Sequence, residues 1–380
     1  MSLIQPTRLE RLSAIRTASN VDAFLLTSPS TVKCFSGYFY DFEIGPSPFH
    51  LLPAALLIAP EQGISMVIAD NESFENQVSG SDISVVQYAS YGYETAIDPA
   101  KEFMFKLLKE LKQKNLGNAV IGIEQNALPF IVSKGILSEY PDVKFVDVSD
   151  EIANLKAVKD GDEIDNICKA TALCDIGQSS VLRNAKVGMT ELELFSIVQT
   201  EIEASVGMRV PIMLDLVSGA RTKEGGGSPS NTIIQQGDLI LSDLTPCLNG
   251  YWGDSCNTIA IGKPTDIQRD HFKMIQQALG SAIDFIRPGV KANAVDGLLR
   301  KHLKSAGNYG HHSGHGVGTT SHELPRIVPY NDILLEENMV IALEPAIYTD
   351  VYGIRLEHMV LVKENGCEIL TKFSHQFEQE

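Results

Sequence analysis

The sequence is poor in basic residues: 31 Lys and Arg stand against 48 Asp and Glu, for a formal net charge of −17. Binding to nucleic-acid phosphates needs a clustered cationic surface, and the chain has no such cluster. It also lacks a run of about 18 apolar residues, as a membrane span requires, and the basic-then-apolar start of a signal peptide. We therefore expect no nucleic-acid partner, no membrane association and a cytoplasmic location.

Cysteine is scarce and scattered. None of the six cysteines forms a CxxC pair, which argues against a disulfide framework and against a thiolate zinc site. We expect reduced thiols, with Cys247 and Cys256 acting as apolar fillers.

The length of 380 residues exceeds what one hydrophobic core usually organises, and the 44% hydrophobic content is that of an ordinary soluble protein. Two domains are therefore expected, residues 1–156 and 157–380. In the first, helical stretches such as 101–114 separate apolar runs that read as buried strands of an α/β domain. These runs are residues 23–26, 54–58, 64–68 and 119–123.

The polar stretch 156–163 precedes a long helical pattern over residues 163–184 and marks the expected boundary. Beyond it, Thr190 with Glu193 fits a capping box, and Asn293 with Asp296 resembles a second helix start about a hundred residues later. The C-terminal half therefore reads as two helix-helix-strand units, related either by pseudo-symmetry or by chance similarity of their helix starts.

Two aspartates flank a predicted β-hairpin. Residues 237–246 and 249–258 read as strands joined by the Asn249-Gly250 turn, with Asp243 near the end of the first strand and Asp254 near the start of the second. Burying a carboxylate is costly unless a positive group pairs with it, and a metal ion would meet that need. Taken alone, the pair could equally be exposed aspartates beside a turn.

A glycine-rich run concentrates histidine. His311, His312, His315 and His322 are four of the nine histidines and fall within twelve residues. Histidine is the commonest metal ligand and a proton carrier near neutral pH, and glycine permits close approach of backbone and ligand. The run therefore favours a site over a structural role.

Two apolar strands follow, and each is predicted to contain one glutamate, Glu344 or Glu357. With Asp243, Asp254 and one histidine of the glycine-rich run these make four carboxylates and one imidazole, which is enough for two adjacent divalent ions. A two-metal centre lowers the pKa of water and polarises a carbonyl, so the set indicates hydrolysis.

These motifs resemble the pita-bread metallopeptidases, which include methionine aminopeptidase, aminopeptidase P, prolidase and the creatinase branch. The matches are Asp243 and Asp254 eleven residues apart, His315 in Gly-His-Gly-Val-Gly, Glu344 in Leu-Glu-Pro-Ala-Ile-Tyr and Glu357 in Ile-Arg-Leu-Glu. The N-terminal half resembles the creatinase-type N-domain. The resemblance implies an α/β N-terminal domain plus an α+β pita-bread C-terminal catalytic domain.

The resemblance also implies roles for the site residues. Asp254 and Glu357 would bridge two metal ions, Asp243 would complete one, and His315 and Glu344 would complete the other. Glu344 would accept a proton, and His311 and His322 would contact the substrate and stabilise the tetrahedral intermediate. Arg355 matches an arginine near the metals of proline peptidases, where it would bind substrate or pair with the acidic cluster.

The implied activity is that of a metallopeptidase, an Xaa-Pro dipeptidase or aminopeptidase P type enzyme. A metal-bridging hydroxide would attack the Xaa carbonyl of a small peptide. Manganese is the preferred ion, with cobalt, zinc or iron as alternatives, and the family pattern implies a homodimer.

Departures from the family pattern leave alternatives open. The usual histidine seventeen residues before Asp243 falls near Gly226, and Thr245 and Asn257 replace a usual glycine and arginine. A non-peptide C–N hydrolase of the creatinase branch, acting on a creatine-like or ectoine-like molecule, is the second hypothesis. A non-catalytic binding module is the third, although every predicted metal ligand is retained.

Overall fold

The computed structural model describes residues 7–39, 52–59, 62–72, 83–307 and 309–379. The chain divides into two compact units, Met1–Leu155 and Lys156–Glu380, each with its own core. Among the helices in the described ranges, none has the length and apolar character needed to cross a membrane.

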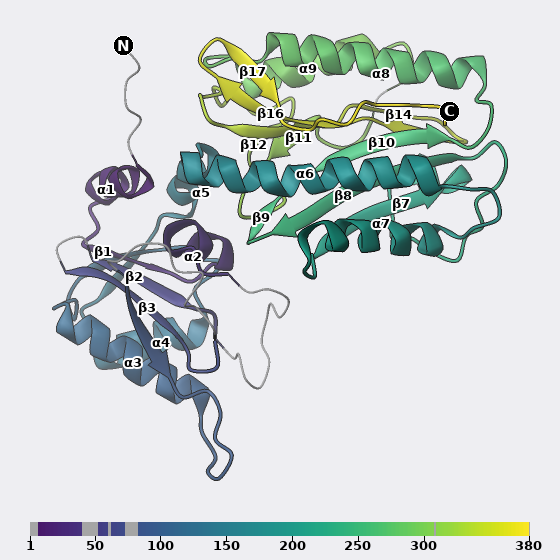
Figure 1. The fold of residues 1–380 in the computed structure, drawn as a ribbon. Coiled ribbons are helices and arrows are strands. Elements are labelled where there is room, and N and C mark those ends of the chain that lie inside the picture. The colour runs from purple at the N-terminus through teal and green to yellow at the C-terminus, as the bar shows by residue number, and fades with distance from the viewer. Residues whose placement is uncertain (1–6, 40–51, 60–61, 73–82, 308, 380) are drawn as a thin grey trace. The chain divides into compact units, whose positions relative to one another are not determined.

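Unit 1 is built on a mixed six-stranded sheet in the order β4-β3-β2-β1-β5-β6 (Figure 1). β1 pairs antiparallel with β2 and parallel with β5, and β3 pairs parallel with β4. The apolar runs of the sequence form its central strands, because strands covered on both faces read as continuous hydrophobic segments. The strands are β1 (Ala23–Leu26), β2 (Ala55–Ala59), β3 (Gly63–Ala69), β4 (Ile83–Tyr88), β5 (Val120–Ile123) and β6 (Lys144–Asp147).

Helices cover both faces of this sheet and bury two apolar clusters. One cluster lies under α3 and α4 and includes Phe103 and Ile136, and the other lies under α1, α2 and α5 and includes Leu12 and Ile152. The predicted helix at 101–114 is α3. The helices are α1 (Arg8–Ala18), α2 (Pro29–Ser36), α3 (Pro99–Gln113), α4 (Phe130–Glu139) and α5 (Ser149–Ala157).

Unit 2 contains two helix pairs, each followed by a strand, as the sequence predicts. Thr190 and Glu193 form the predicted capping box at the start of α7. Asn293 does not cap α9, whose N-cap is Lys291; Asp296 instead turns inward and is buried. The helices are α6 (Gly161–Asn184), α7 (Glu191–Val206), the 3-10 helix η1 (Gly219–Glu224), α8 (Asp266–Phe285) and α9 (Ala292–Leu303).

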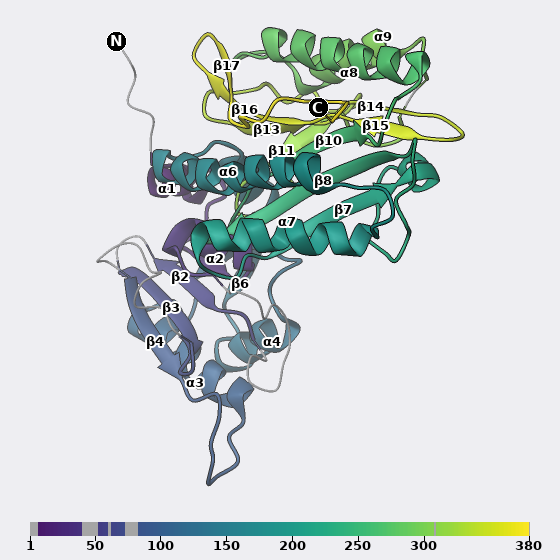
Figure 2. The ribbon, with the colours of Figure 1, turned by 45° about the vertical axis from the view of Figure 1, so that its right-hand side comes forward.

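The strands of unit 2 form three sheets, and α6 and α7 lie on the opposite side of them from α8 and α9 (Figure 1, Figure 2). The first sheet has the order β10-β8-β7, with β9 beside β8; the second has the order β12-β11-β13-β16-β17; β14 pairs with β15. The strands are β7 (Ile212–Ser218), β8 (Leu239–Leu248), β9 (Tyr251–Trp252), β10 (Ser255–Ala260), β11 (Gly314–Gly316), β12 (Glu323–Ile327), β13 (Val340–Leu343), β14 (Ala346–Tyr348), β15 (Gly353–Arg355), β16 (His358–Lys363) and β17 (Gly366–Ile369).

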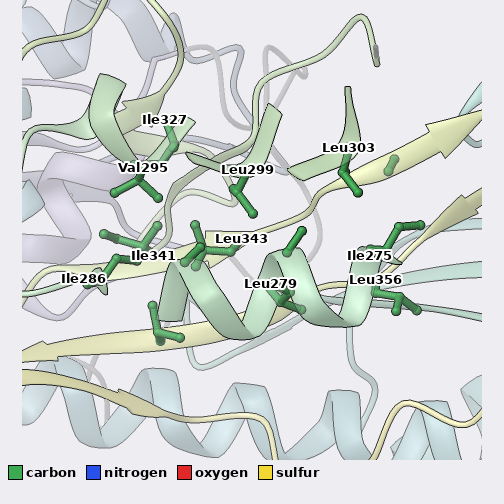
Figure 3. Packing of buried hydrophobic residues seen from close by; sticks show 14 of the residues in the cluster. Ile275, Leu279, Ile286, Val295, Leu299, Leu303, Ile327, Ile341, Leu343 and Leu356 are labelled. Carbon is green, nitrogen blue, oxygen red and sulfur yellow. The ribbon is translucent and has the colours of Figure 1, made fainter. Parts of the chain in front are cut away.

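The largest core cluster fixes α8 and α9 against the second sheet (Figure 3). Ile275 and Leu279 of α8 and Leu299 of α9 are buried with Ile341 and Leu343 of β13. A fully buried aliphatic side chain contributes about 1.5–3 kcal/mol relative to an exposed one. This packing holds the strands of the second sheet, which carry or flank His315, Glu344 and Glu357.

Candidate metal centre

One cavity of about 630 Å³ in unit 2 gathers every residue that the sequence predicts for the site. The predicted site residues that line this cavity are Asp243, Asp254, His311, His315, His322, Glu344, Arg355 and Glu357. They are spread over residues 243–357 of the chain, so only the fold brings them together.

The predicted hairpin delivers the two aspartates. Asn249 and Gly250 both have positive φ, as the predicted turn requires, and Asp243 lies within β8. The returning strand is interrupted between β9 and β10, and Asp254 lies in that gap. Oδ1 of Asp254 accepts a hydrogen bond from Thr245 at 3.0 Å, so the hairpin itself orients this carboxylate.

The two glutamates do not lie inside regular strands, and that prediction is wrong. Glu344 lies between β13 and β14, and Glu357 lies between β15 and β16. Each backbone N–H bonds to another segment: Glu344 donates to the Ser313 carbonyl at 3.0 Å and Glu357 to the Cys256 carbonyl at 2.9 Å. In a regular strand, successive side chains must point to opposite faces of the sheet. Glu344 and Glu357 lie outside regular strands, so this rule does not fix their direction, and both line the cavity.

His315 lies at the centre of the short strand β11, between β12 and β13, and is almost fully buried. Its Nε2 is 3.6 Å from Oδ2 of Asp254 and 3.6 Å from Oε1 of Glu344. Its Nδ1 is 3.0 Å from the Gly316 carbonyl, an arrangement that leaves Nε2 facing the carboxylates. Candidate ligand atoms of Asp254, His315 and Glu357 all lie within 4.8 Å of one another.

The clustered carboxylates of Asp243, Asp254 and Glu357 repel one another, and burial destabilises their charged forms. Burial raises the pKa of Asp254 and of Glu357 well above the usual carboxyl value, and their carboxylate neighbours raise both further. Burial also raises the pKa of Asp243 to about 6, although Arg355 opposes the shift. Buried carboxylates this close together need positive charge beyond the single arginine they share.

A divalent metal fits this donor set. Among the described residues, Oδ1 of Asp243 and Oε2 of Glu357 are buried with no hydrogen-bond partner. A buried unpaired oxygen is costly, and hard or borderline cations take carboxylate and imidazole donors. Burial lowers the pKa of His315 to about 4, so this imidazole is neutral at pH 7, the form that binds metal.

The other two predicted histidines lie beside the cluster. Nε2 of His311 is 3.1 Å from the Tyr348 hydroxyl, and Nδ1 is 3.6 Å from Oε2 of Glu344. His322 is exposed, and its ring stacks on His315 with centroids 4.0 Å apart. Burial lowers the pKa of both His311 and His322, which favours neutral rings able to donate or accept a hydrogen bond.

Arg355 is a partner of the acidic cluster. Its Nη2 donates to Oδ2 of Asp243, and its Nη1 donates to the Gly225 carbonyl at 2.6 Å and to Tyr348. The same environment stabilises the ionised form of Glu344. Burial raises the pKa of Glu344, but the hydrogen bond from His312 and the charge of Arg355 outweigh burial and lower that pKa to about 2. Glu344 is therefore ionised at neutral pH.

Sequence analysis assigned no role in the site to four residues that line or support it. His312 Nε2 is 2.7 Å from Oε1 of Glu344, and Tyr348 and Asp215 line the cavity. Asp296 accepts hydrogen bonds from Arg300 and Ser313 and so anchors the histidine-rich loop. The adjacency of His312 to His311 was a usable signal, whereas Asp215 lies far from any motif in the sequence.

Comparison with known proteins agrees with this geometry. The sequence pattern of metallopeptidase family M24 matches residues 165–364, and that of the creatinase/prolidase N-terminal domain matches residues 8–158. The chain is 28% identical to an Xaa-Pro dipeptidase of Lactobacillus delbrueckii subsp. lactis over 97% of both chains.

Solved structures share the whole fold. The prolidase of Pyrococcus horikoshii superposes with a TM-score of 0.81 at 25% identity, and the X-Pro aminopeptidase of Thermotoga maritima with a TM-score of 0.81 at 26% identity. Each match covers 97% of this chain and 99% of the other. The predicted α/β N-terminal domain and α+β pita-bread catalytic domain are thereby confirmed. The chain belongs to metallopeptidase family M24.

Proposed function

We propose that this protein is a binuclear metal-dependent hydrolase that cleaves the peptide bond between a residue Xaa and proline. The observation that carries the proposal is the convergence of four carboxylates, three of them buried and that of Asp243 partly buried, and one imidazole in one cavity, with unpaired oxygens on Asp243 and Glu357. The similarity to an Xaa-Pro dipeptidase, a prolidase and an X-Pro aminopeptidase supports the choice of bond.

Five residues would hold the metals. Asp254 and Glu357 would be shared between two ions, with Asp243 completing one and His315 and Glu344 the other. When bound, such ions lower the pKa of water and polarise a carbonyl group. We propose manganese as the native ion, since an Asp, Glu and His set suits it, although the same donors accept zinc, cobalt or iron.

The protein groups supply proton transfer and orientation. Ionised Glu344 accepts a proton from the attacking water and returns it to the proline nitrogen as the bond breaks. Nδ1 of His311 donates to the His312 carbonyl at 2.7 Å, and Nε2 is 3.1 Å from the Tyr348 hydroxyl. His311 would therefore stabilise the developing oxyanion through Nε2 by taking up a second proton as the negative charge forms. His322, exposed at the cavity rim, contacts the proline side of the substrate.

We assign residues 1–156 as the N-terminal domain and 157–380 as the catalytic domain. The compact units and the two family matches support this division. A homodimer and a cytoplasmic location are proposed on the family resemblance and the sequence composition.

The test is release of free proline from Leu-Pro by protein preincubated with manganese, beside the tripeptide Leu-Pro-Gly and creatine. Proline from the dipeptide identifies a dipeptidase, and free leucine from the tripeptide alone identifies an aminopeptidase P type enzyme. Hydrolysis of creatine alone would overturn the proposal in favour of the creatinase branch.

A further inference from the structure

Asp215 lies beside the metal centre without belonging to the predicted ligand set. It is on β7, directly opposite Asp243 of β8 in the strand register, and its carboxylate lines the same cavity. The Asp215 side chain is 40% exposed, whereas that of Asp243 is 17% exposed. Asp215 therefore places a carboxylate on the wall of the cavity, outside the buried cluster.

The glycine at position 226 makes room for this carboxylate. A Cβ atom at Gly226 would lie 1.9 Å from Oδ2 of Asp215. The space that any side chain at position 226 would need is therefore occupied by a negatively charged oxygen.

The negative charge of Asp215 is only loosely matched by the protein. Nη2 of Arg355 is 3.8 Å from Oδ2 of Asp215, but the hydrogen bonds of that guanidinium go to Asp243, to Tyr348 and to a backbone carbonyl. The other cation of the cavity wall, Lys223, lies 3.9 Å from Glu224. A cation entering the cavity would therefore meet a carboxylate without a close partner.

An apolar surface adjoins the carboxylate. Met213 is two residues before Asp215 and so lies on the same face of β7, lines the cavity and is 46% exposed. A lysine or arginine side chain has an aliphatic stem and a charged end. Along β7, Met213 offers an apolar surface for such a stem, and Asp215 offers a carboxylate for its charged end.

We propose that Asp215 selects substrates whose Xaa residue is lysine or arginine, with Met213 packing on the methylene groups. This inference rests on the proposed Xaa-Pro hydrolysis. The α-amino nitrogen is only two bonds from the carbonyl carbon that is attacked, so it lies close to the buried cluster. The more exposed Asp215 suits the longer reach of a cationic side chain.

The experiment separates this inference from the proposed function. Turnover of Leu-Pro by the manganese-loaded wild type tests the function. Selectivity is tested by calorimetric binding of Lys-Pro, Leu-Pro and Glu-Pro to manganese-loaded E344Q and to E344Q/D215N, which needs no turnover. E344Q/E224Q is the matched control, because it removes one negative charge from the same wall without touching the Gly226 site.

D215N is expected to weaken Lys-Pro binding about tenfold relative to Leu-Pro and to strengthen Glu-Pro binding. The control is expected to change the Lys-Pro to Leu-Pro ratio by less than about threefold. Equal weakening of all three dipeptides would overturn the inference, because it would assign Asp215 to the shared α-amino group or to holding Arg355. An unchanged ratio in D215N would overturn it as well.

Discussion

Nε2 of His312 lies 2.7 Å from Oε1 of Glu344, so the proposed proton acceptor is oriented by an imidazole that directly follows another site histidine. We predict that H312A lowers kcat about tenfold while metal content stays unchanged, because Glu344 loses its orienting donor. H312Q, which keeps a donor, should recover part of the rate. H302A is the control, since His302 is exposed on α9, and an equal loss in H302A would contradict the prediction.

Metal binding depends on Asp254. We predict that D254A loses most of its bound divalent metal on dialysis, because this carboxylate would be shared by both ions and is buried beside His315 and Glu357. Elemental analysis after dialysis measures the loss. D266A, which removes a fully solvated aspartate of α8, should keep the wild-type metal content. Retention of full occupancy by D254A would rule out the proposed bridging position.

His311 and Tyr348 act in sequence along one hydrogen-bond chain. H311A is expected to lower kcat about a hundredfold with metals retained, the usual effect of deleting an oxyanion donor. Y348F removes only the hydroxyl that contacts His311 and Arg355, so its loss should be smaller. Steady-state kinetics together with metal analysis distinguish the two. A larger loss of kcat in Y348F than in H311A would contradict the assignment of His311, and not Tyr348, to the oxyanion.

A buried ion pair next to the histidine-rich loop contributes to stability. Nζ of Lys159 is 2.6 Å from Oε2 of Glu323, Lys156 is 3.3 Å from the other oxygen, and the carboxylate is buried. We predict that K159M lowers the free energy of unfolding by about 3 kcal/mol, because it leaves a buried charge poorly compensated. K273M, at an exposed position of α8, is the control, and urea unfolding is the measurement.

The same pair predicts a pH dependence. Burial alone would raise the pKa of Glu323, but Lys159 and Lys156 outweigh it and hold that pKa well below the usual value of 4.5. A lowered carboxyl pKa contributes stability that is complete above pH 4.5 and declines as the pH falls below it. The difference in unfolding free energy between wild type and K159M should therefore shrink below pH 4.5. A constant difference would contradict the assigned pKa direction.

Local sequence signals predicted most of the architecture. The apolar runs at β1, β2, β3 and β5, the capping box at Thr190 and the Asn249-Gly250 turn all depend on neighbours in the chain, so they could be read directly. Asn293 does not cap α9 because the backbone of residues 291–293 pairs with residues 331–334, a tertiary contact that starts the helix earlier.

The site was predictable in residue identity and less so in geometry. The motifs that resemble the pita-bread metallopeptidases predicted Asp243, Asp254, His315, Glu344 and Glu357, and the fold places all five around one cavity. The interruption at Glu344 has a local signal, because Pro345 cannot donate to a strand ladder, whereas the residues around Glu357 contain no such breaker. Contacts such as that between Asp215 and Arg355, 3.8 Å apart, join segments 140 residues apart in the chain and have no signature in either segment alone.

The most direct test of the central claim compares proline release from Leu-Pro by manganese-loaded wild type and E344Q, with metal content and thermal unfolding measured on the same samples. The account predicts proline release by wild type and at least a hundredfold slower release by E344Q, which keeps its fold because an amide is nearly isosteric with the carboxylate it replaces. Full activity in E344Q would contradict the assignment of Glu344 as proton acceptor, and with it the proposed mechanism.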